Sequence, residues 1–486
     1  MAGPQHYRIA VIGAGFSGLG AAIRLKQQGY DDFVVIDRGT EVGGTWRDNT
    51  YPGCACDVPS HLYSFSFDLN PEWSRSFSPQ PEIWDYLRRC VAEYGLERHL
   101  RLATEMHGAA WDGGRWVVET SQGTYSADVL ISGAGGLCEP AVPKLPGLET
   151  FTGDVFHSAR WRHDLDLTGR RVAVVGTGAS AIQFVPAIAP DVERLHLFQR
   201  TAPWVMRKTD RPISRLERRA FRAVPGAQRL ARGSIYWVRE FWQGTAFLNP
   251  VMMRLGQRMA RAHLRKQVPD PALRAKLTPR YRMGCKRVLL SNDYYPALTR
   301  SNVEVVEGGV TEVRPDAVVA ADGTVREVDT IIFGTGFHVT DSPIAQLIRG
   351  RDGRTLAEVW QGSPQAYLGT TVAGFPNLFL LLGPGTGTGH TSVVFMMECQ
   401  LAYVLDALRH LDRTGAATIE PTPAAQRTFV STVDRKMAGT VWQTGCKSWY
   451  QDATGRVATI WPGYTWSYRL RTRRFDPADY EVVARA

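Results

Sequence analysis

The sequence predicts an α/β protein with two Rossmann-like dinucleotide-binding domains and an inserted helical segment. A glycine-rich loop follows a short apolar stretch twice, at residues 13–18 and at residues 176–181, which indicates two nucleotide sites. Residues 205–280 lack the strand–helix alternation found on either side of them and predict helices instead. A chain of 486 residues is too long for one core, so two or three domains are expected.

The first loop has the pattern GxGxxG, formed by Gly13, Gly15 and Gly18. A strand, a helix and a second strand are expected around it, at residues 8–12, 19–28 and 33–36. The glycines allow a tight turn and a close approach to a pyrophosphate, which the helix N-terminus attracts. Asp37 ends the second strand, where it can accept hydrogen bonds from ribose hydroxyls. This context predicts a dinucleotide site; a glycine-rich turn in an unrelated α/β domain is the alternative.

The second loop reads GxGxxA and contains Gly176, Gly178 and Ser180. A strand, a helix and a strand are again expected around it, at residues 171–175, 181–189 and 195–198. No acid ends this unit, and Arg200 and Thr201 follow instead. An arginine here suits a 2′-phosphate, which favours NADPH over NADH. An arginine on a solvated turn is the alternative.

Several further stretches are expected to surround these two units. Asp57 follows two turn-rich motifs, GGTW at residues 43–46 and YPG at residues 51–53; such an acid is more often structural than catalytic. Alternation at residues 62–67 predicts a strand or an aromatic lining. Other helices are expected at residues 81–94 and 391–411, and other strands at residues 116–120, 128–132, 302–306, 318–320, 330–337 and 377–382. Residues 383–390 form a third glycine-rich turn, a weaker signal because the GxGxxG spacing is absent.

The positive charge is concentrated in one segment. The chain has a net charge of +10, and residues 205–280 alone hold 18 Lys and Arg against 4 acids. This local excess does not indicate a nucleic-acid partner. We expect the arginine-rich helix faces to be solvated; contact with an anionic membrane surface is the alternative.

The seven cysteines are scattered, and Cys54 and Cys56 are too close together for a zinc site. The sequence therefore predicts reduced thiols, a cytoplasmic location and no metal. Residues 1–7 lack the apolar region of a signal peptide, and no run of 18 apolar residues predicts an integral membrane segment.

The loops and the segment that joins them resemble the Baeyer–Villiger monooxygenases, the class B flavoprotein monooxygenases. That family's linker pattern, FxGxxxHxxxW, is matched by Phe151, Gly153, His157 and Trp161, and Arg162 follows where the family has Pro or Asp. A second pattern, GGxW and then (F/Y)PGxxxD, is matched by Gly43, Gly44, Trp46, Tyr51, Pro52, Gly53 and Asp57. The resemblance covers nearly the whole chain, although the helical insertion matches by position alone.

The resemblance implies an FAD-binding domain at residues 1–138 and 338–486, an NADPH-binding domain at 139–204 and 281–337, and a helical insertion at 205–280. It implies that Phe151, Gly153, His157 and Trp161 form a hinge, with His157 structural rather than a base. The residues expected to bind the cofactors are Gly13, Gly15, Gly18, Asp37, Thr45, Trp46, Asp57, Gly176, Gly178, Ser180, Arg200, Thr201, Lys286 and Trp449.

The resemblance also implies a reaction. NADPH reduces FAD, the reduced flavin captures O2 as a C4a-peroxide, and the peroxide converts a small-molecule ketone to an ester or lactone. Arg287 is the expected catalytic cation, because an arginine keeps its proton and stabilises a developing oxyanion by charge. Asp57 would orient Arg287, and Lys286 would contact the nicotinamide.

Two other functions stay open. One is a flavin-containing N- or S-oxygenase, and the other is a flavin NADPH oxidase without productive oxygenation. Trp161 and Arg287 favour the Baeyer–Villiger branch, because the N- and S-oxygenating branch usually has another aromatic residue in place of this tryptophan. The sequence predicts neither the ketone nor the oligomeric state.

Overall fold

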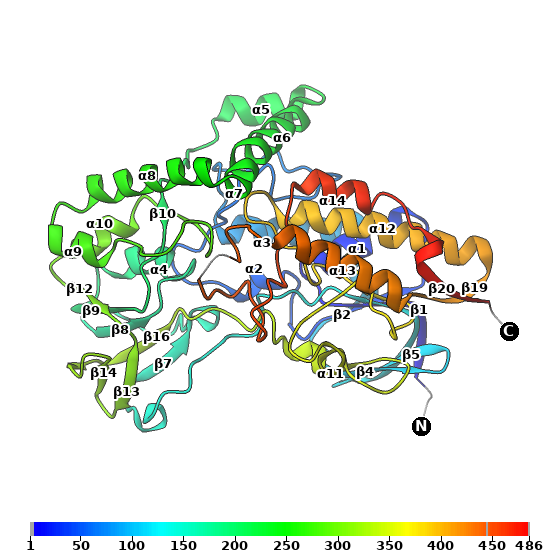
Figure 1. The fold of residues 1–486 in the computed structure, drawn as a ribbon, viewed down its shortest axis with the longest axis horizontal. Helices are drawn as coiled ribbons and strands as arrows, with labels where there is room; N and C mark the ends of the chain where they lie inside the picture. The colour runs from blue at the N-terminus through cyan, green and yellow to red at the C-terminus, as the bar shows by residue number, and fades with distance from the viewer. Residues whose placement is uncertain (1–3, 444–445, 485–486) are drawn as a thin grey trace.

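The computed structural model describes residues 4–443 and 446–484, and its two large sheets lie side by side (Figure 1). The first sheet has the strand order β17-β4-β5-β6-β1-β2-β3, and β18 pairs with β6. β1 lies parallel to both β2 and β6. The bounds are β1 (Gln5–Ile12), β2 (Phe33–Ile36), β3 (Leu100–Arg101), β4 (Met106–Asp112), β5 (Arg115–Thr120), β6 (Gly123–Ser132), β17 (Ile348–Arg349) and β18 (Leu378–Leu380).

Helices cover the faces of the first sheet. α12 begins where the Ser392 hydroxyl accepts a hydrogen bond from Val394 N, and it ends at Gly415 with a φ of +65°. α1 packs against both α12 and α3, so these three helices bury one layer of the core. The helices of this half are α1 (Phe16–Gln27), α2 (Thr45–Asp48), α3 (Gln80–Tyr94), α11 (Leu356–Trp360), α12 (Val393–Thr414), α13 (Pro423–Met437) and α14 (Thr465–Arg471).

The second sheet is fully parallel, with the strand order β12-β9-β8-β16-β7. Its central strands are buried apolar runs, as expected for a parallel sheet covered on both faces. Its elements are β7 (Asp154–His157), β8 (Arg171–Val175), α4 (Ala181–Ile188), β9 (Arg194–Gln199), α10 (Tyr294–Leu298), β12 (Val303–Glu307) and β16 (Thr330–Phe333). A small antiparallel sheet adjoins it, formed by β13 (Val310–Arg314), β14 (Ala317–Ala320) and β15 (Val325–Glu327).

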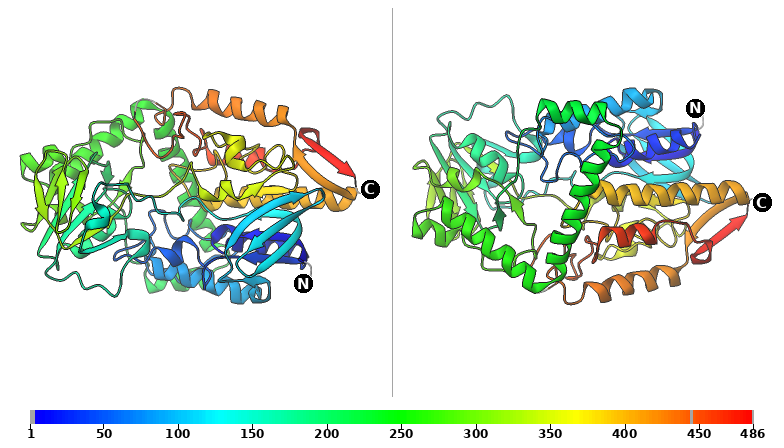
Figure 2. Two further views of the ribbon diagram at one scale, coloured as in Figure 1. Left: turned by 90° about the horizontal axis from the view of Figure 1, so that it is seen from below. Right: turned by 90° about the horizontal axis from the view of Figure 1, so that it is seen from above.

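The insertion is helical, as predicted, and it crosses from one half of the molecule to the other (Figure 2). A short strand pair, β10 (Val205–Met206) with β11 (Leu289–Leu290), closes its base. α5 begins with a capping box formed by Ser214 and Glu217. The insertion consists of α5 (Arg215–Ala223), α6 (Ala227–Val238), the π-helical turn η4 (Arg239–Gly244), α7 (Thr245–Leu248), α8 (Pro250–Gln267) and α9 (Pro271–Lys276).

The chain ends against the first half. β19 (Ala416–Pro421) pairs antiparallel with β20 (Tyr480–Ala484) and joins residues 480–484 to the end of α12. Short 3-10 turns complete the fold at η1 (Glu97–His99), η2 (Leu148–Thr150), η3 (Ser158–Arg160), η5 (Pro343–Gln346) and η6 (Pro477–Asp479). Among the described residues, no helix combines the length and the apolar character needed to cross a bilayer.

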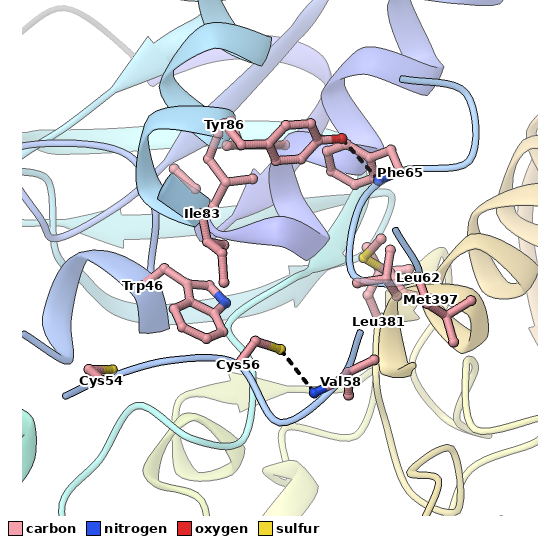
Figure 3. Packing of buried hydrophobic residues seen from close by; sticks show 14 of the residues in the cluster. Trp46, Cys54, Cys56, Val58, Leu62, Phe65, Ile83, Tyr86, Leu381 and Met397 are labelled. Carbon is pink, nitrogen blue, oxygen red and sulfur yellow. Dashed lines mark hydrogen bonds between the residues drawn. The ribbon is translucent and has the colours of Figure 1, made fainter. Parts of the chain in front are cut away.

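Residues 62–67 do not form a strand, so that half of the prediction was wrong. The aromatic alternative describes them better: Phe65 is fully buried, and its ring lies 5.3 Å from that of Phe16. Its backbone nitrogen donates to the Tyr86 hydroxyl at 2.9 Å (Figure 3). The segment therefore fills the core with rings while a side chain, and not a neighbouring strand, satisfies this part of its backbone.

The prediction of solvated arginines in the insertion was wrong for Arg232. This side chain is 9% exposed, and its Nη1 donates to the carbonyl oxygens of His61 and Ser64 at 2.7 and 3.1 Å. The buried guanidinium thus joins α6 to the loop before α3.

Candidate functional site

The first glycine loop has the shape that a dinucleotide requires. Gly13 has a φ of +98°, and a Cβ built on it would lie 2.8 Å from the carbonyl oxygen of Gly133. A Cβ on Gly18 would lie 1.7 Å from the carbonyl oxygen of Gly13, which only glycine permits. Gly15 faces the GGTW motif of residues 43–46, and a Cβ built on Gly15 would lie 3.5 Å from Gly44 Cα. The loop therefore fits a group that approaches the backbone at the start of α1.

Asp37 lies at the end of β2 with one hydrogen-bonding position to spare. Its Oδ2 accepts from Ala14 N at 2.7 Å, and its Oδ1 accepts from Gly39 N at 2.7 Å and Arg47 Nη1 at 2.8 Å. An ionised carboxylate accepts about four hydrogen bonds, so one remains for a ribose hydroxyl. Thr45 and Trp46 begin α2 nearby, and Trp46 Nε1 donates to the Tyr63 hydroxyl at 3.0 Å.

The second loop repeats this construction after β8. Gly176 has a φ of +112°, and a Cβ on it would lie 2.5 Å from the carbonyl oxygen of Gly334. Gly178 is exposed, and Ser180 precedes α4 without capping it. The Thr177 hydroxyl donates to the carbonyl oxygen of Thr201 at 3.2 Å, which ties the loop to the end of β9. The exposed backbone at the N-terminus of α4 suits a second phosphate group.

Two cations converge beside the second loop. Lys286 has a lowered pKa because it is partly buried and because Arg200 lies near it. Its Nζ stands 5.1 Å from the centre of the Tyr281 ring, while Arg200 is exposed. Among the described residues neither cation forms a salt bridge with a carboxylate, so together they suit a doubly charged group such as a 2′-phosphate.

Asp57 and Arg287 form an ion pair between the two nucleotide loops. Both Nε and Nη2 of Arg287 donate to Oδ2 of Asp57, at 3.0 and 2.7 Å. Each side chain is less than one third exposed, at 28% and 29%. Burial alone would raise the pKa of Asp57, but the charge and hydrogen bonds of Arg287 hold it below its usual value. The charge of Asp57 in turn raises the pKa of Arg287, so both groups stay charged.

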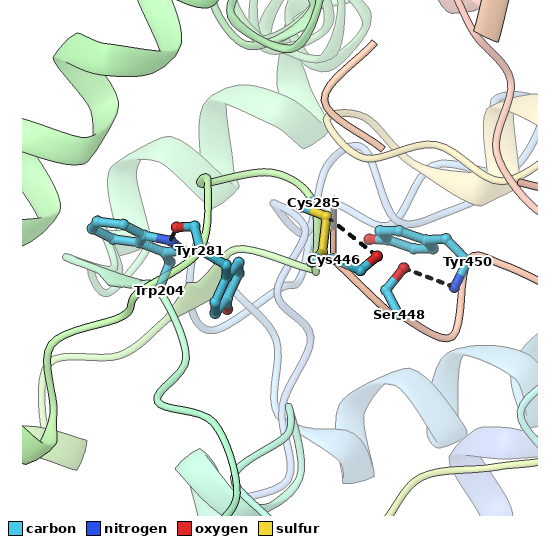
Figure 4. Close-up of a disulfide and its surroundings, with 6 residues drawn as sticks. All are labelled: Trp204, Tyr281, Cys285, Cys446, Ser448 and Tyr450. Atoms are coloured by element: carbon cyan, nitrogen blue, oxygen red, sulfur yellow. Dashed lines mark hydrogen bonds between the residues drawn. A yellow bond between two sulfur atoms is a disulfide. The ribbon is translucent and has the colours of Figure 1, made fainter. Parts of the chain in front are cut away.

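A disulfide joins the segment just before Arg287 to the C-terminal segment (Figure 4). Cys285, two residues before Arg287, is bonded to Cys446, and their Cα atoms are 6.2 Å apart. The prediction that the thiols are reduced was therefore wrong for these two cysteines; Cys54, Cys56, Cys90, Cys138 and Cys399 are free. The bond brings the C-terminal segment to the site. There Tyr450 is buried near Arg287, and Trp449, predicted to bind cofactor, is 44% exposed.

The YPG motif holds the two halves together through Gln183 of α4. The Gln183 Oε1 accepts from the Tyr51 hydroxyl at 3.0 Å and from Ala55 N at 3.2 Å, while its Nε2 donates to the carbonyl oxygen of Ala55 at 3.0 Å. A Cβ on Gly53 would lie 2.8 Å from the carbonyl oxygen of Gln183. Sequence reasoning missed Gln183, the one polar side chain of α4, because a lone polar residue in an apolar helix does not show which distant segment it contacts.

The predicted hinge packs on the second sheet. His157 ends β7, and its Nδ1 accepts a hydrogen bond from Ala159 N at 3.1 Å. Burial lowers the pKa of His157 to about 4, so its ring is neutral at neutral pH. A Cβ on Gly153 would lie 2.3 Å from the carbonyl oxygen of Asp329. Phe151 packs against the buried apolar cluster that contains Ile331 and Phe333 of β16. Trp161 contacts the Phe184 ring of α4 at 5.4 Å.

Two strand–loop–helix–strand units and a half-buried Arg–Asp pair define a two-dinucleotide oxidoreductase. A family model described as pyridine nucleotide-disulphide oxidoreductase matches residues 10–219. A Streptomyces coelicolor protein named Baeyer-Villiger monooxygenase is 54% identical over 483 residues, which cover 99% of this chain and 93% of that protein.

Solved structures of monooxygenases also match this chain. The closed crystal structure of cyclohexanone monooxygenase matches with a TM-score of 0.89 at 30% identity, and the crystal structure of OTEMO in complex with FAD and NADP matches with 0.89 at 27% identity. Each match covers 99% of this chain and 100% of that one. The chain belongs to the Baeyer–Villiger monooxygenase family. It is a flavin-dependent monooxygenase that uses FAD, NADPH and O2, which confirms the expected fold, activity and cofactors.

Proposed function

We propose that the Asp57–Arg287 pair is the place where this enzyme converts a ketone to an ester or lactone. The observation that carries the proposal is the geometry of the pair: a permanently charged guanidinium is fixed by two hydrogen bonds to one carboxylate oxygen, between the two glycine loops. Bound flavin, once reduced, supplies the activation of O2 for transfer of one oxygen atom.

Arg287 would stabilise negative charge on the reacting oxygen atoms. Two of its five N–H donors go to Oδ2 of Asp57 and the Tyr450 hydroxyl is within reach of another, so donors remain for a substrate oxygen. Asp57 fixes the direction in which that donor points, and it cannot act as an acid because its pKa is lowered. The pair thus provides charge and orientation, while proton transfer is left to other groups.

The remaining predicted residues take roles that their positions support. We assign FAD to the first loop, with Gly13, Gly15, Gly18, Asp37, Thr45 and Trp46, and NADPH to the second loop, with Gly176, Gly178, Ser180, Arg200, Thr201 and Lys286. Trp449 would cover the cofactors from the C-terminal segment. The domains would keep the predicted limits, 1–138 with 338–486 for FAD and 139–204 with 281–337 for NADPH, because the chain crosses between the sheets near both limits.

The cytoplasmic location was predicted from scattered, reduced thiols, and it stays a proposal. The disulfide between Cys285 and Cys446 counts against it, because disulfides are rare in reducing compartments. Fractionation of the source cells with a compartment marker would decide.

A stopped-flow experiment tests the proposed reaction. The holoenzyme is reduced with NADPH without oxygen, mixed with O2, and supplied with linear, cyclic and aryl ketones, and the products are identified by mass. Ester or lactone formed in proportion to the NADPH consumed supports the proposal. Oxygenation of thioethers or amines alone, or release of all the oxygen as hydrogen peroxide, would reject it.

A further inference from the structure

Arg239 begins the π-helical turn η4, where the insertion passes over the first half of the molecule. A π-turn places more residues in each turn than an α-helix and therefore redirects the side chains that it carries. Such turns occur mostly as single interruptions in α-helices, often at functional sites. In this chain the turn separates α6 from α7; of its first two residues, Arg239 is half-buried and Glu240 is buried.

The next residue, Glu240, fixes the turn in place. It is 1% exposed, and its Oε2 accepts a hydrogen bond from His390 Nε2 at 2.8 Å, in the glycine-rich segment before α12. The backbone nitrogen and the hydroxyl of Thr465, at the start of α14, also donate to Glu240. At the far end of the turn, a Cβ on Gly244 would lie 3.1 Å from the Tyr464 ring. The turn is therefore held at both ends by the first half of the molecule.

This anchoring directs Arg239 toward the Asp57–Arg287 pair. The Arg239 Nε donates to the carbonyl oxygen of His390 at 2.8 Å. Burial lowers the pKa of Arg239 to about 10, Asp57 partly offsets this, and the charge of Arg287 adds to the lowering. Arg239 and the pair thus lie within electrostatic reach of one another. Among the described residues, no carboxylate lies within 4 Å of Arg239 and no acceptor contacts its two Nη atoms.

Asp57, the carboxylate that acts on Arg239, is already paired with Arg287. Asp57 accepts both of its hydrogen bonds from Arg287, and Lys208 also lies within electrostatic reach of it. The site therefore carries an excess of positive charge. We assign the phosphates of the two dinucleotides to the N-termini of α1 and α4 and to the Arg200 and Lys286 cations, so none of them is assigned to Arg239.

We propose that Arg239 binds the substrate and that the enzyme prefers ketones that carry a carboxylate at a distance from the carbonyl. This inference rests on the proposed function and names its substrate class. The two free Nη atoms form a planar fork that matches a carboxylate, and a desolvated cation regains more from an anion than from a neutral group. Arg287 would face the carbonyl, and Arg239 would fix the other end of the molecule.

Matched substrate pairs test the proposal with the holoenzyme. Each keto acid, with two to six carbons between the ketone and the carboxylate, is compared with its methyl ester; 4-oxocyclohexanecarboxylate and its ester form one pair. The variants are Arg239→Gln, Arg239→Lys and a control, Arg229→Gln, which removes the same charge from an exposed position on α6. Flavin content and the rate of flavin reduction by NADPH are measured for each.

The parent should favour at least one acid over its ester. Arg239→Gln should lower kcat/KM for that acid by about 10–100-fold, mainly through KM, because one charge-assisted contact is lost. The methyl ester, flavin reduction and the control should remain within about twofold of the parent, a change too small to indicate a lost contact. Arg239→Lys should retain part of the preference for the acid over its ester. If Arg239→Gln fails to fold, the acid-to-ester ratio of Arg239→Lys is compared with that of the parent instead.

Three results would overturn the inference. The parent could show no preference for any acid, Arg239→Gln could affect acid and ester equally, or it could slow flavin reduction, which would assign Arg239 to the cofactors. A different failure belongs to the proposed function itself: the parent would then form no ester or lactone from any ketone, neutral ones included, while it still consumed NADPH.

Discussion

Replacement of Arg287 by alanine is the sharpest test of the proposed site. The substitution removes the cation and leaves Asp57 in a largely enclosed position, with Arg239 and Lys208 as its nearby cations. It does not touch either glycine loop. Bound flavin and its reduction by NADPH should therefore persist, while oxygen transfer to the ketone should fail.

Two costs follow from the geometry of the pair. Loss of one charged donor to a developing oxyanion costs about 2.7–4 kcal/mol, or roughly 100–1000-fold in kcat. Removal of one partner from a buried ion pair costs about 3–5 kcal/mol of stability. The lower end applies here, because each side chain is between a quarter and a third exposed. Without Arg287, burial should raise the pKa of Asp57, because the charge that lowers it is gone.

The assay separates the two costs. Ester formation and NADPH oxidation are measured together at saturating ketone, and thermal unfolding is followed by flavin fluorescence. Arg287→Lys is the matched control, because it keeps a charge but loses the two-donor contact at 3.0 and 2.7 Å; an intermediate loss of about tenfold is expected. If Arg287→Ala still makes ester at a third or more of the parent rate while fully loaded with flavin, the role assigned to Arg287 is wrong.

Three further predictions follow from other parts of the structure. Arg200→Ala should raise KM for NADPH by at least about tenfold and leave KM for NADH nearly unchanged; equal losses would reject 2′-phosphate recognition. A thiol titration of the denatured, unreduced enzyme should find five thiols, since two of the seven cysteines form the disulfide; seven thiols would contradict the bond. Cys446→Ser should lower the free energy of unfolding by up to about 5 kcal/mol, the value for a closed loop of this length. Because burial lowers the pKa of His157 to about 4, the unfolded chain binds a proton that the folded one excludes, so stability should fall as pH drops from about 6.5 toward 4. His157→Gln should flatten this dependence in denaturant titrations, and an unchanged slope would refute the buried neutral ring; His61, whose pKa is also about 4, should keep some slope in place.

The two nucleotide units could be predicted because their signals are local. Gly13 and Gly18 are required by contacts within the same loop and with the chain just after β6. A short sequence pattern is therefore enough to predict the nucleotide-binding loop. The alternation at residues 62–67 was misleading for the opposite reason. Alternating rings such as Phe65 and Phe67 stack at 4.9 Å as readily in an irregular segment as on a strand, and only the neighbouring chain decides between the two.

The disulfide and Arg239 could not be predicted, since both depend on distant contacts. Cys285 and Cys446 are 161 residues apart and have no characteristic spacing. Arg239 is one of many cations in a basic stretch, and its pattern resembles that of the solvated ones. What distinguishes it is Glu240, an isolated acid in the middle of an apolar and basic segment. An acid in that position would need a buried partner, and His390 provides it from 150 residues away.

The same contacts limit how the two halves can move. The stretch from Phe151 to Trp161 was predicted to be a hinge, and its role in gating stays a prediction, but β7 pairs along its length with β16 and so moves with the second sheet. The crossings between the sheets lie elsewhere. There Ala141 N donates to the Gly336 carbonyl oxygen at 2.9 Å, and His338 N donates to that of Glu139 at 2.9 Å. The two crossing strands are thus bonded to each other and should bend as one. Because the disulfide beside Arg287 also joins the halves, rotation about this double strand must carry the C-terminal segment with it. A motion that changes the access of NADPH would therefore displace Tyr450 at the catalytic pair as well, which couples cofactor exchange to the arrangement of the site.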